Sequence, residues 1–103
     1  MKKFKTPDDI QIAKQLLSPP GDTIKDTIKM YNLTQTELAE RMEVAEETID
    51  DIIKAKTPIT QEIATKLERI LAIPADFWLK REEDYQIQLH EIQEAEQTKN
   101  KHA

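Results

Sequence analysis

The chain has 103 residues, enough for one domain that buries about two-thirds of the surface of the unfolded chain. Charged residues make up 34% and hydrophobic residues 38% of the chain, and a single glycine leaves too few turn residues for hairpins, so the composition predicts an all-α fold. The net charge is -5, and the lack of cysteine excludes disulfides and thiolate metal sites.

The sequence shows no targeting or membrane segment. Its basic start is followed by Thr-Pro-Asp-Asp at residues 6–9, where a secretory signal would have an apolar region. The longest apolar run is only a few residues, whereas a membrane helix needs about 20. We therefore expect a cytoplasmic protein that does not contact a membrane.

Residues 1–18 predict a short helical extension. Thr6 is suited to cap a helix that has a proline at its first position and two acids in its first turn. An apolar stripe follows at helical spacing, formed by Ile10, Ala13, Leu16 and Leu17. The Ser-Pro-Pro-Gly run ends this helix, and Asp22 is expected to cap the next one, which runs to about Tyr31.

Residues 33–58 predict two short helices joined by a tight turn, which is a helix-turn-helix pattern. Thr34 and Glu37 form a capping box at the first helix. The apolar positions with helical spacing are Leu38, Ala39, Met42, Val44, Ile49, Ile52 and Ile53. Glu43 stands at the turn, where glycine is usual, so we expect a left-handed Glu43 at a cost of about 1 kcal/mol.

Two more helices are expected after the motif. Thr60 caps the first, whose inner face carries Ile63, Leu67, Ile70 and Leu71. From Ala75 no proline or glycine interrupts the chain, which predicts a helix to about Glu96 whose far half projects or pairs, followed by a frayed polar tail. The expected organisation is an N-terminal extension (1–18), a helix-turn-helix domain (19–80) and a C-terminal helix with its tail (81–103).

The reactive side chains argue against an enzyme. One serine, no cysteine and two histidines provide no nucleophile with a base and an orienting group. His90 and Glu94 lie one helical turn apart, but two ligands without a third seldom form a metal site. We expect no catalytic residues, no metal and no cofactor.

Four segments carry a family resemblance: Pro19–Asp22, Leu33–Arg41, Pro58–Thr60 and Ile73–Leu79. Together they resemble the HigA-type antitoxins of the Cro/repressor-like (Xre) helix-turn-helix family, and the similarity covers residues 19–85. The Pro-Ile-Thr and Phe-Trp-Leu sequences are its most specific parts. The resemblance implies a compact five-helix domain, here with an extra short N-terminal helix and a long C-terminal helix.

The resemblance also implies a function. HigA-type proteins are usually homodimers that neutralise a HigB-like, mRNA-cleaving toxin and repress the promoter of the type II toxin-antitoxin module. By resemblance, Gln35 would touch a phosphate and Thr36 is a further DNA-binding residue. Lys54 and Lys56 would reach the DNA backbone at the far end of the motif. The residues that would face bases are Ala45, Glu46, Glu47, Thr48 and Asp50.

The second motif helix conflicts with this expectation. Residues 43–56 carry five acids and two lysines, whereas duplex DNA carries one negative charge per about 1.7 Å. Family members commonly have serine at the position of Ala45 and glycine at that of Ala55. Two hypotheses stay open: an antitoxin and autorepressor that binds operator DNA, or a protein-interaction module that has lost DNA binding. Lys2, Lys3 and Lys5 are candidates for a DNA-binding arm.

A dimer or toxin interface is expected along the C-terminal helix. Its candidate residues are Trp78, Tyr85, Leu89 and Ile92. An exposed apolar row on a long helix favours a partner. Trp78 is also expected to seal the last two helices of the domain together.

Overall fold

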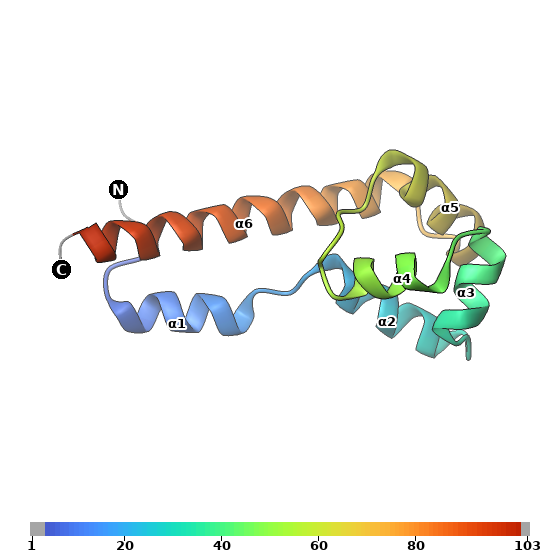
Figure 1. Ribbon diagram of the computed structural model, residues 1–103, viewed down its shortest axis with the longest axis horizontal. Coiled ribbons are helices and arrows are strands. Elements are labelled where there is room, and N and C mark those ends of the chain that lie inside the picture. The colour runs from blue at the N-terminus through green and yellow to red at the C-terminus, as the bar shows by residue number, and fades with distance from the viewer. Residues whose placement is uncertain (1–3, 102–103) are drawn as a thin grey trace. The chain divides into compact units, whose positions relative to one another are not determined.

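The computed structural model describes residues 4–101, and the side chains of residues 4–97. The described residues form six α-helices and no strand (Figure 1). The helices are α1 (Pro7–Leu16), α2 (Pro20–Met30), α3 (Gln35–Met42), α4 (Glu46–Ile53), α5 (Gln61–Leu71) and α6 (Ala75–Lys101). The predicted all-α fold, with five helices after an extra N-terminal helix, is confirmed.

Threonine caps begin three of the helices, as predicted. The hydroxyl oxygens of Thr6, Thr34 and Thr60 accept backbone N–H bonds from Asp9 (3.2 Å), Glu37 (3.0 Å) and Ile63 (3.3 Å). At α1 and α3 the acidic side chain returns the bond to the N–H of its threonine, which completes a capping box. These local bonds set where α1, α3 and α5 start.

The start of α2 differs from the prediction. Pro19 occupies the N-cap without a side-chain bond, and Asp22 lies within the first turn, so the expected Asp22 cap is wrong. The fixed φ of proline already suits the start of a helix. The adjacent Gly21 is needed for packing, because a Cβ there would lie 2.3 Å from the carbonyl oxygen of Ile53 at the end of α4.

Four described residues have left-handed backbone, and none of them is glycine. They are Asn32 (φ 57°), Glu43 (φ 59°), Ala55 (φ 61°) and Ala72 (φ 60°). Each lies just after a helix, in the order α2, α3, α4 and α5. The predicted left-handed Glu43 is confirmed, and the single glycine serves a close approach of two helices instead of a turn.

Residues Pro19–Glu83 form a compact unit with one hydrophobic core. All five helices from α2 onward contribute to it: Ile24, Ile28, Leu38, Ala39, Met42, Ile49, Ile52, Ile53, Ile59, Ile63, Ala64, Leu67, Leu71 and Trp78 are buried. Trp78 is fully enclosed and meets the ring of Phe77 edge-on, with the ring centroids 5.2 Å apart. This core holds α3 and α4 in place.

Polar side chains near the start of α6 form hydrogen bonds with two other segments of this unit. Arg81 donates to the carbonyl oxygen of Pro19 (3.0 Å) and to the hydroxyl of Thr23 (3.2 Å) at the start of α2. The Glu82 carboxylate accepts the backbone N–H of Ile59 (2.9 Å) in the segment between α4 and α5. The start of α6 therefore anchors both segments.

A second compact unit combines residues 1–18 with residues 84–103. Among its described residues, Ile10 of α1 and Ile92 of α6 are buried, and Lys14 forms an ion pair with Glu96. The far half of α6 thus pairs with α1. The predicted end of this helix at Glu96 is wrong, because α6 continues to Lys101.

Candidate nucleic-acid interface

A left-handed turn joins α3 to α4. The N–H of Val44 donates to the carbonyl oxygen of Ala39 (3.0 Å), and that of Glu43 donates to Glu40 (3.1 Å). These bonds satisfy two carbonyls in the last turn of α3 and turn the chain toward α4. Ala39 is only 3% exposed, so its small side chain lets the two helices approach closely. The predicted helix-turn-helix geometry is confirmed.

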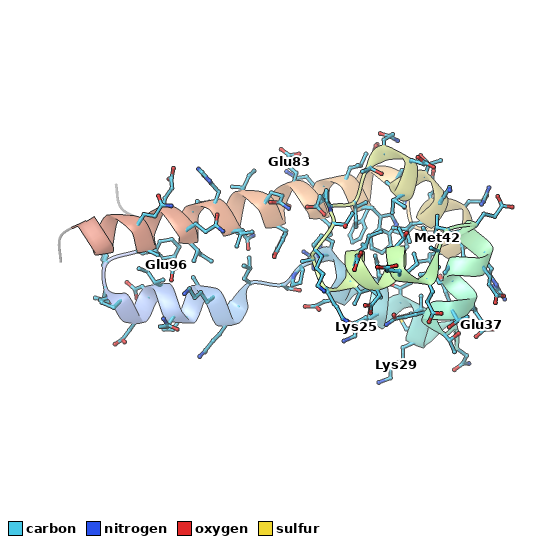
Figure 2. All side chains as sticks on the ribbon, viewed as in Figure 1. Lys25, Lys29, Glu37, Met42, Glu83 and Glu96 are labelled. Carbon is cyan, nitrogen blue, oxygen red and sulfur yellow. The ribbon has the colours of Figure 1, made fainter. Side chains whose placement is uncertain are left out.

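The two faces of α4 differ in burial. Ile49, Ile52 and Ile53 lie in the core, and Met42 of α3 points into the same interior (Figure 2). On the other side Glu46 and Glu47 are exposed, while Thr48, Asp50 and Asp51 are half-buried. The outward face of α4 therefore begins with two carboxylates, and Ala45 at the N-cap offers no side-chain bond.

Two of the acids on α4 are engaged by neighbouring side chains. The hydroxyl of Thr36 on α3 donates to the carboxylate of Glu46 (2.8 Å). The ammonium group of Lys54 pairs with Asp50 (2.8 Å), one helical turn away. Glu47 has no hydrogen bond or ion pair among the described residues. The structure therefore brings two pairs of predicted residues together: Thr36 with Glu46, and Asp50 with Lys54.

The two lysines after α4 differ in their surroundings. Asp50 accepts a hydrogen bond from Lys54, and this bond and the negative charge of Asp50 raise the pKa of Lys54 above its ordinary value. Lys56 is exposed and has no side-chain partner in the described part of the chain. Between them the left-handed Ala55 ends the helix. Lys56 is thus the lysine better placed to meet a phosphate.

The start of α3 is the remaining part of the candidate DNA-binding surface, which also includes the outward face of α4 and the two lysines that follow it. Gln35 is the first residue of α3 and is half-buried, whereas Thr36 is exposed. Glu37, labelled in Figure 2, is held by the backbone N–H of Thr34 (3.0 Å). The Asp50–Lys54 pair is readable from its four-residue spacing. The Thr36–Glu46 bond joins two helices and has no local signal in the sequence.

Two of the four residues predicted for the partner interface are buried. Trp78 is fully buried in the core and Ile92 is 4% exposed, so neither side chain is available at a surface. Tyr85 and Leu89 are half-buried. Among the described side chains of the unit that α1 and the far half of α6 form, the exposed large apolar ones are instead Ile12, Leu16 and Ile87. Helix α1 covers part of the apolar row on α6.

His90 and the N-terminal lysines lie outside the outward face of α4. The Nε2 of His90 lies 2.9 Å from a carboxylate oxygen of Glu94, and the described residues contain no group of three or more potential metal ligands. No described helix has the length and apolar character needed to cross a membrane. Of the proposed N-terminal arm, Lys5 is exposed, and Lys2 and Lys3 lie outside the described residues.

Residues 24–78 match the helix-turn-helix family HTH_3. This match runs from α2 into the start of α6 and covers more than half of the chain. The chain belongs to the helix-turn-helix family.

Among curated proteins, this helix-turn-helix protein is similar to the uncharacterized HTH-type transcriptional regulator YddM of Escherichia coli K12. The two are 32% identical over 60 residues, which cover 58% of this chain and 64% of the relative. The match therefore spans less than two-thirds of the length of YddM.

Two solved structures show the same fold. The antitoxin HigA of Pseudomonas aeruginosa, solved with the higBA promoter, has a TM-score of 0.73 at 21% identity, over 82% of this chain and 92% of HigA. A putative antidote protein of a plasmid maintenance system from Nostoc punctiforme has a TM-score of 0.77 at 23% identity, over 84% and 97%. The helix-turn-helix protein thus has the fold of HigA-type antitoxins.

Proposed function

We propose that this helix-turn-helix protein is a HigA-like antitoxin that binds operator DNA and represses its own promoter. The main support for the proposal is that the outward face of α4 is exposed. The first two residues of α4, Glu46 and Glu47, are exposed while the other face of the helix is fixed in the core, as a helix that enters a major groove requires. The shared fold with HigA, which was solved with its promoter, supports the same function.

In this proposal residues 19–80 are the DNA-binding domain, flanked by extensions at 1–18 and 81–103. Gln35 and Thr36 lie at the DNA backbone, and Lys54 and Lys56 reach it beyond α4. The groove-facing residues are Ala45, Glu46, Glu47, Thr48 and Asp50. Binding to chromosomal DNA would place the protein in the cytoplasm.

The assembly proposed is a homodimer on a two-fold symmetric operator. Its two half-sites would lie one helical turn apart, at about 34 to 36 Å. Tyr85 and Leu89, with the exposed Ile12, Leu16 and Ile87, are the side chains we assign to protein contacts. The proposed protein partner is a HigB-like toxin.

The alternative, a protein-interaction module without DNA binding, has less support. It depends on an acidic surface that is free to meet a basic partner. Glu46 already accepts a hydrogen bond from Thr36, and the charge of Asp50 is partly offset by Lys54. The favoured function remains operator binding.

A titration tests the operator proposal. We expect a labelled duplex from the region upstream of the protein's own gene to bind at least tenfold more tightly than a scrambled duplex of equal composition. Gln35→Ala should weaken binding, and Glu68→Gln on the exposed face of α5 is the control that should not. Equal affinity for both duplexes would remove this part of the proposal.

Co-expression tests the antitoxin proposal. The protein encoded next to this gene is expressed alone and together with the helix-turn-helix protein. We expect growth arrest in the first case, recovery in the second, and a complex that survives gel filtration. Arrest that persists without complex formation would contradict a role as its antitoxin.

A further inference from the structure

The three groove-facing acids of α4 are not equivalent. Glu46 is fixed by the hydroxyl of Thr36 (2.8 Å), and Asp50 is paired with Lys54 (2.8 Å). Each carboxylate therefore has part of its hydrogen-bonding capacity used within the protein. The bonds also favour one rotamer of each of these two side chains.

Glu47 differs from both. It is exposed, it is the second residue of α4, and no described residue bonds to its carboxylate. The N-terminal residues of a recognition helix are those that reach base edges in the major groove. Glu47 thus enters the proposed interface with all of its acceptor positions unused.

The chemistry of an ionised carboxylate limits what it can bind there, because it only accepts hydrogen bonds. In the major groove guanine presents two acceptors, N7 and O6, and thymine presents the O4 acceptor and a methyl group. Adenine has a donor, N6, but its N7 acceptor lies beside it and repels a carboxylate. Cytosine presents the N4 amino donor without a neighbouring acceptor of its own. A free carboxylate therefore favours cytosine.

We propose that Glu47 is a specificity-determining residue that accepts a hydrogen bond from the N4 amino group of one cytosine in each operator half-site. The inference rests on the proposed operator binding. It gives the acidic helix a role in DNA binding: Thr36 and Lys54 hold two of the three groove-facing acids, and the third, Glu47, selects a base.

Selection from a pool of random duplexes tests this inference. The wild-type protein should enrich cytosine at one position of each half-site. Glu47→Ala should lose that preference, and Glu47→Gln should shift it to adenine, because glutamine donates to N7 and accepts from N6. Glu68→Gln makes the same change of charge on the exposed face of α5 and should leave the preference unchanged.

A paired substitution locates the bond. In the selected duplex the cytosine is replaced by a pyrimidine that lacks the 4-amino group. We expect about a fivefold or greater loss of affinity for the wild type, the usual size of a base-pair mismatch. The same replacement should have no effect on Glu47→Ala, since the two changes remove the same interaction.

The outcomes separate the inference from the function on which it rests. If the wild type enriches no sequence, operator binding itself fails. If it enriches a sequence that is the same for wild type, Glu47→Ala and Glu47→Gln, operator binding stands and the role of Glu47 is overturned. The role of Glu47 would also be overturned if Glu47→Ala bound the duplex without the 4-amino group more weakly than the duplex with cytosine. Circular dichroism and the fluorescence of the buried Trp78 verify that each variant is folded.

Discussion

Glu43 links a single backbone angle to the geometry of the motif. Its φ of 59° is left-handed, a conformation in which a residue with a Cβ is less stable than glycine by about 1 kcal/mol. We expect Glu43→Gly to raise the free energy of unfolding by about this amount. Urea unfolding followed by the fluorescence of Trp78, the single tryptophan, measures the change.

Glu40→Gly is the matched control for this prediction. It makes the same exchange inside α3, where glycine lowers helix stability by about 1 kcal/mol. The two substitutions should therefore change stability in opposite directions. A destabilised Glu43→Gly would contradict the role assigned to the turn.

Gly21 is constrained by packing against another helix. A Cβ at this position would lie 2.3 Å from the oxygen and 2.4 Å from the Cα of Ile53, both of which are backbone atoms that cannot move aside cheaply. Gly21→Ala should lower the free energy of unfolding by about 1 to 3 kcal/mol, the usual effect of overpacking. Lys25→Ala, at an exposed position of the same helix, should change it by less than about 0.5 kcal/mol. Equal effects in urea unfolding would show that Gly21 has no packing role.

The pKa of Lys54 reports whether its pair with Asp50 forms in solution. The hydrogen bond and charge of Asp50 raise this pKa, so the stabilisation is present at neutral pH and is lost as the pH rises through the raised pKa in the alkaline range. Asp50→Asn should lower the pKa of Lys54. An NMR titration of its side chain measures the shift, and an unchanged pKa would mean that the pair does not form.

The residues of the motif differ in how far the sequence predicts them. The left-handed Glu43 follows from its position after Ala39, and the Asp50–Lys54 pair from its spacing. The role of Gly21 depends on Ile53 in another helix, and the Thr36–Glu46 bond also joins two helices. Such contacts depend on the tertiary packing, so no local sequence pattern predicts them.

Helix boundaries followed the sequence where a side chain caps the backbone. The starts at Thr6, Thr34 and Thr60 were predictable because each cap is local. The start of α2 was not, because two prolines begin it without a cap. The end of α6 at Lys101 is not predictable either, because no glycine or proline marks where an uninterrupted helix stops.

The segment between α4 and α5 is held by the first turns of α6. The Glu82 carboxylate accepts the N–H of Ile59 (2.9 Å), which is buried. Removing this acceptor in Glu82→Ala should cost about 1.5 to 3 kcal/mol of stability, because the hydrogen bond lost is one to a charged group. Hydrogen exchange of the Ile59 amide should become faster.

Two variants sharpen this test. Glu82→Gln keeps an acceptor oxygen and should protect the Ile59 amide better than Glu82→Ala. Glu83→Ala alters the exposed neighbour, labelled in Figure 2, and should leave the amide unchanged. An Ile59 amide that exchanges at the same rate in all three variants would contradict the anchoring role of Glu82.

The pairing of α1 with the far half of α6 could not be read from the sequence. Each helix shows an apolar stripe, but a stripe does not identify its partner. The burial of Ile10 and Ile92 and the ion pair of Lys14 with Glu96 establish the pairing. This pairing buries Ile92 within the chain and leaves Ile12, Leu16 and Ile87 as the exposed large apolar side chains among the described residues of that unit.

The net charge of the chain falls on the unit that carries the motif. Residues 19–83 contain nine basic and fourteen acidic residues, which accounts for the whole net charge of -5. A protein of this kind has few cations to neutralise phosphates, so its affinity for DNA should depend on salt less steeply than that of a basic repressor. Specific base contacts must then supply more of the binding free energy.

The salt dependence of operator binding tests this account most directly. For a dimer that uses Lys54 and Lys56 of each subunit, the logarithm of the binding constant should fall with the logarithm of salt concentration with a slope of about -3 to -4. Lys56→Gln should reduce the slope by about 2. Preferential binding of the protein's own promoter with these slopes is the predicted result. No preference over a scrambled duplex at any salt concentration, or a slope unaffected by Lys56→Gln, would contradict it.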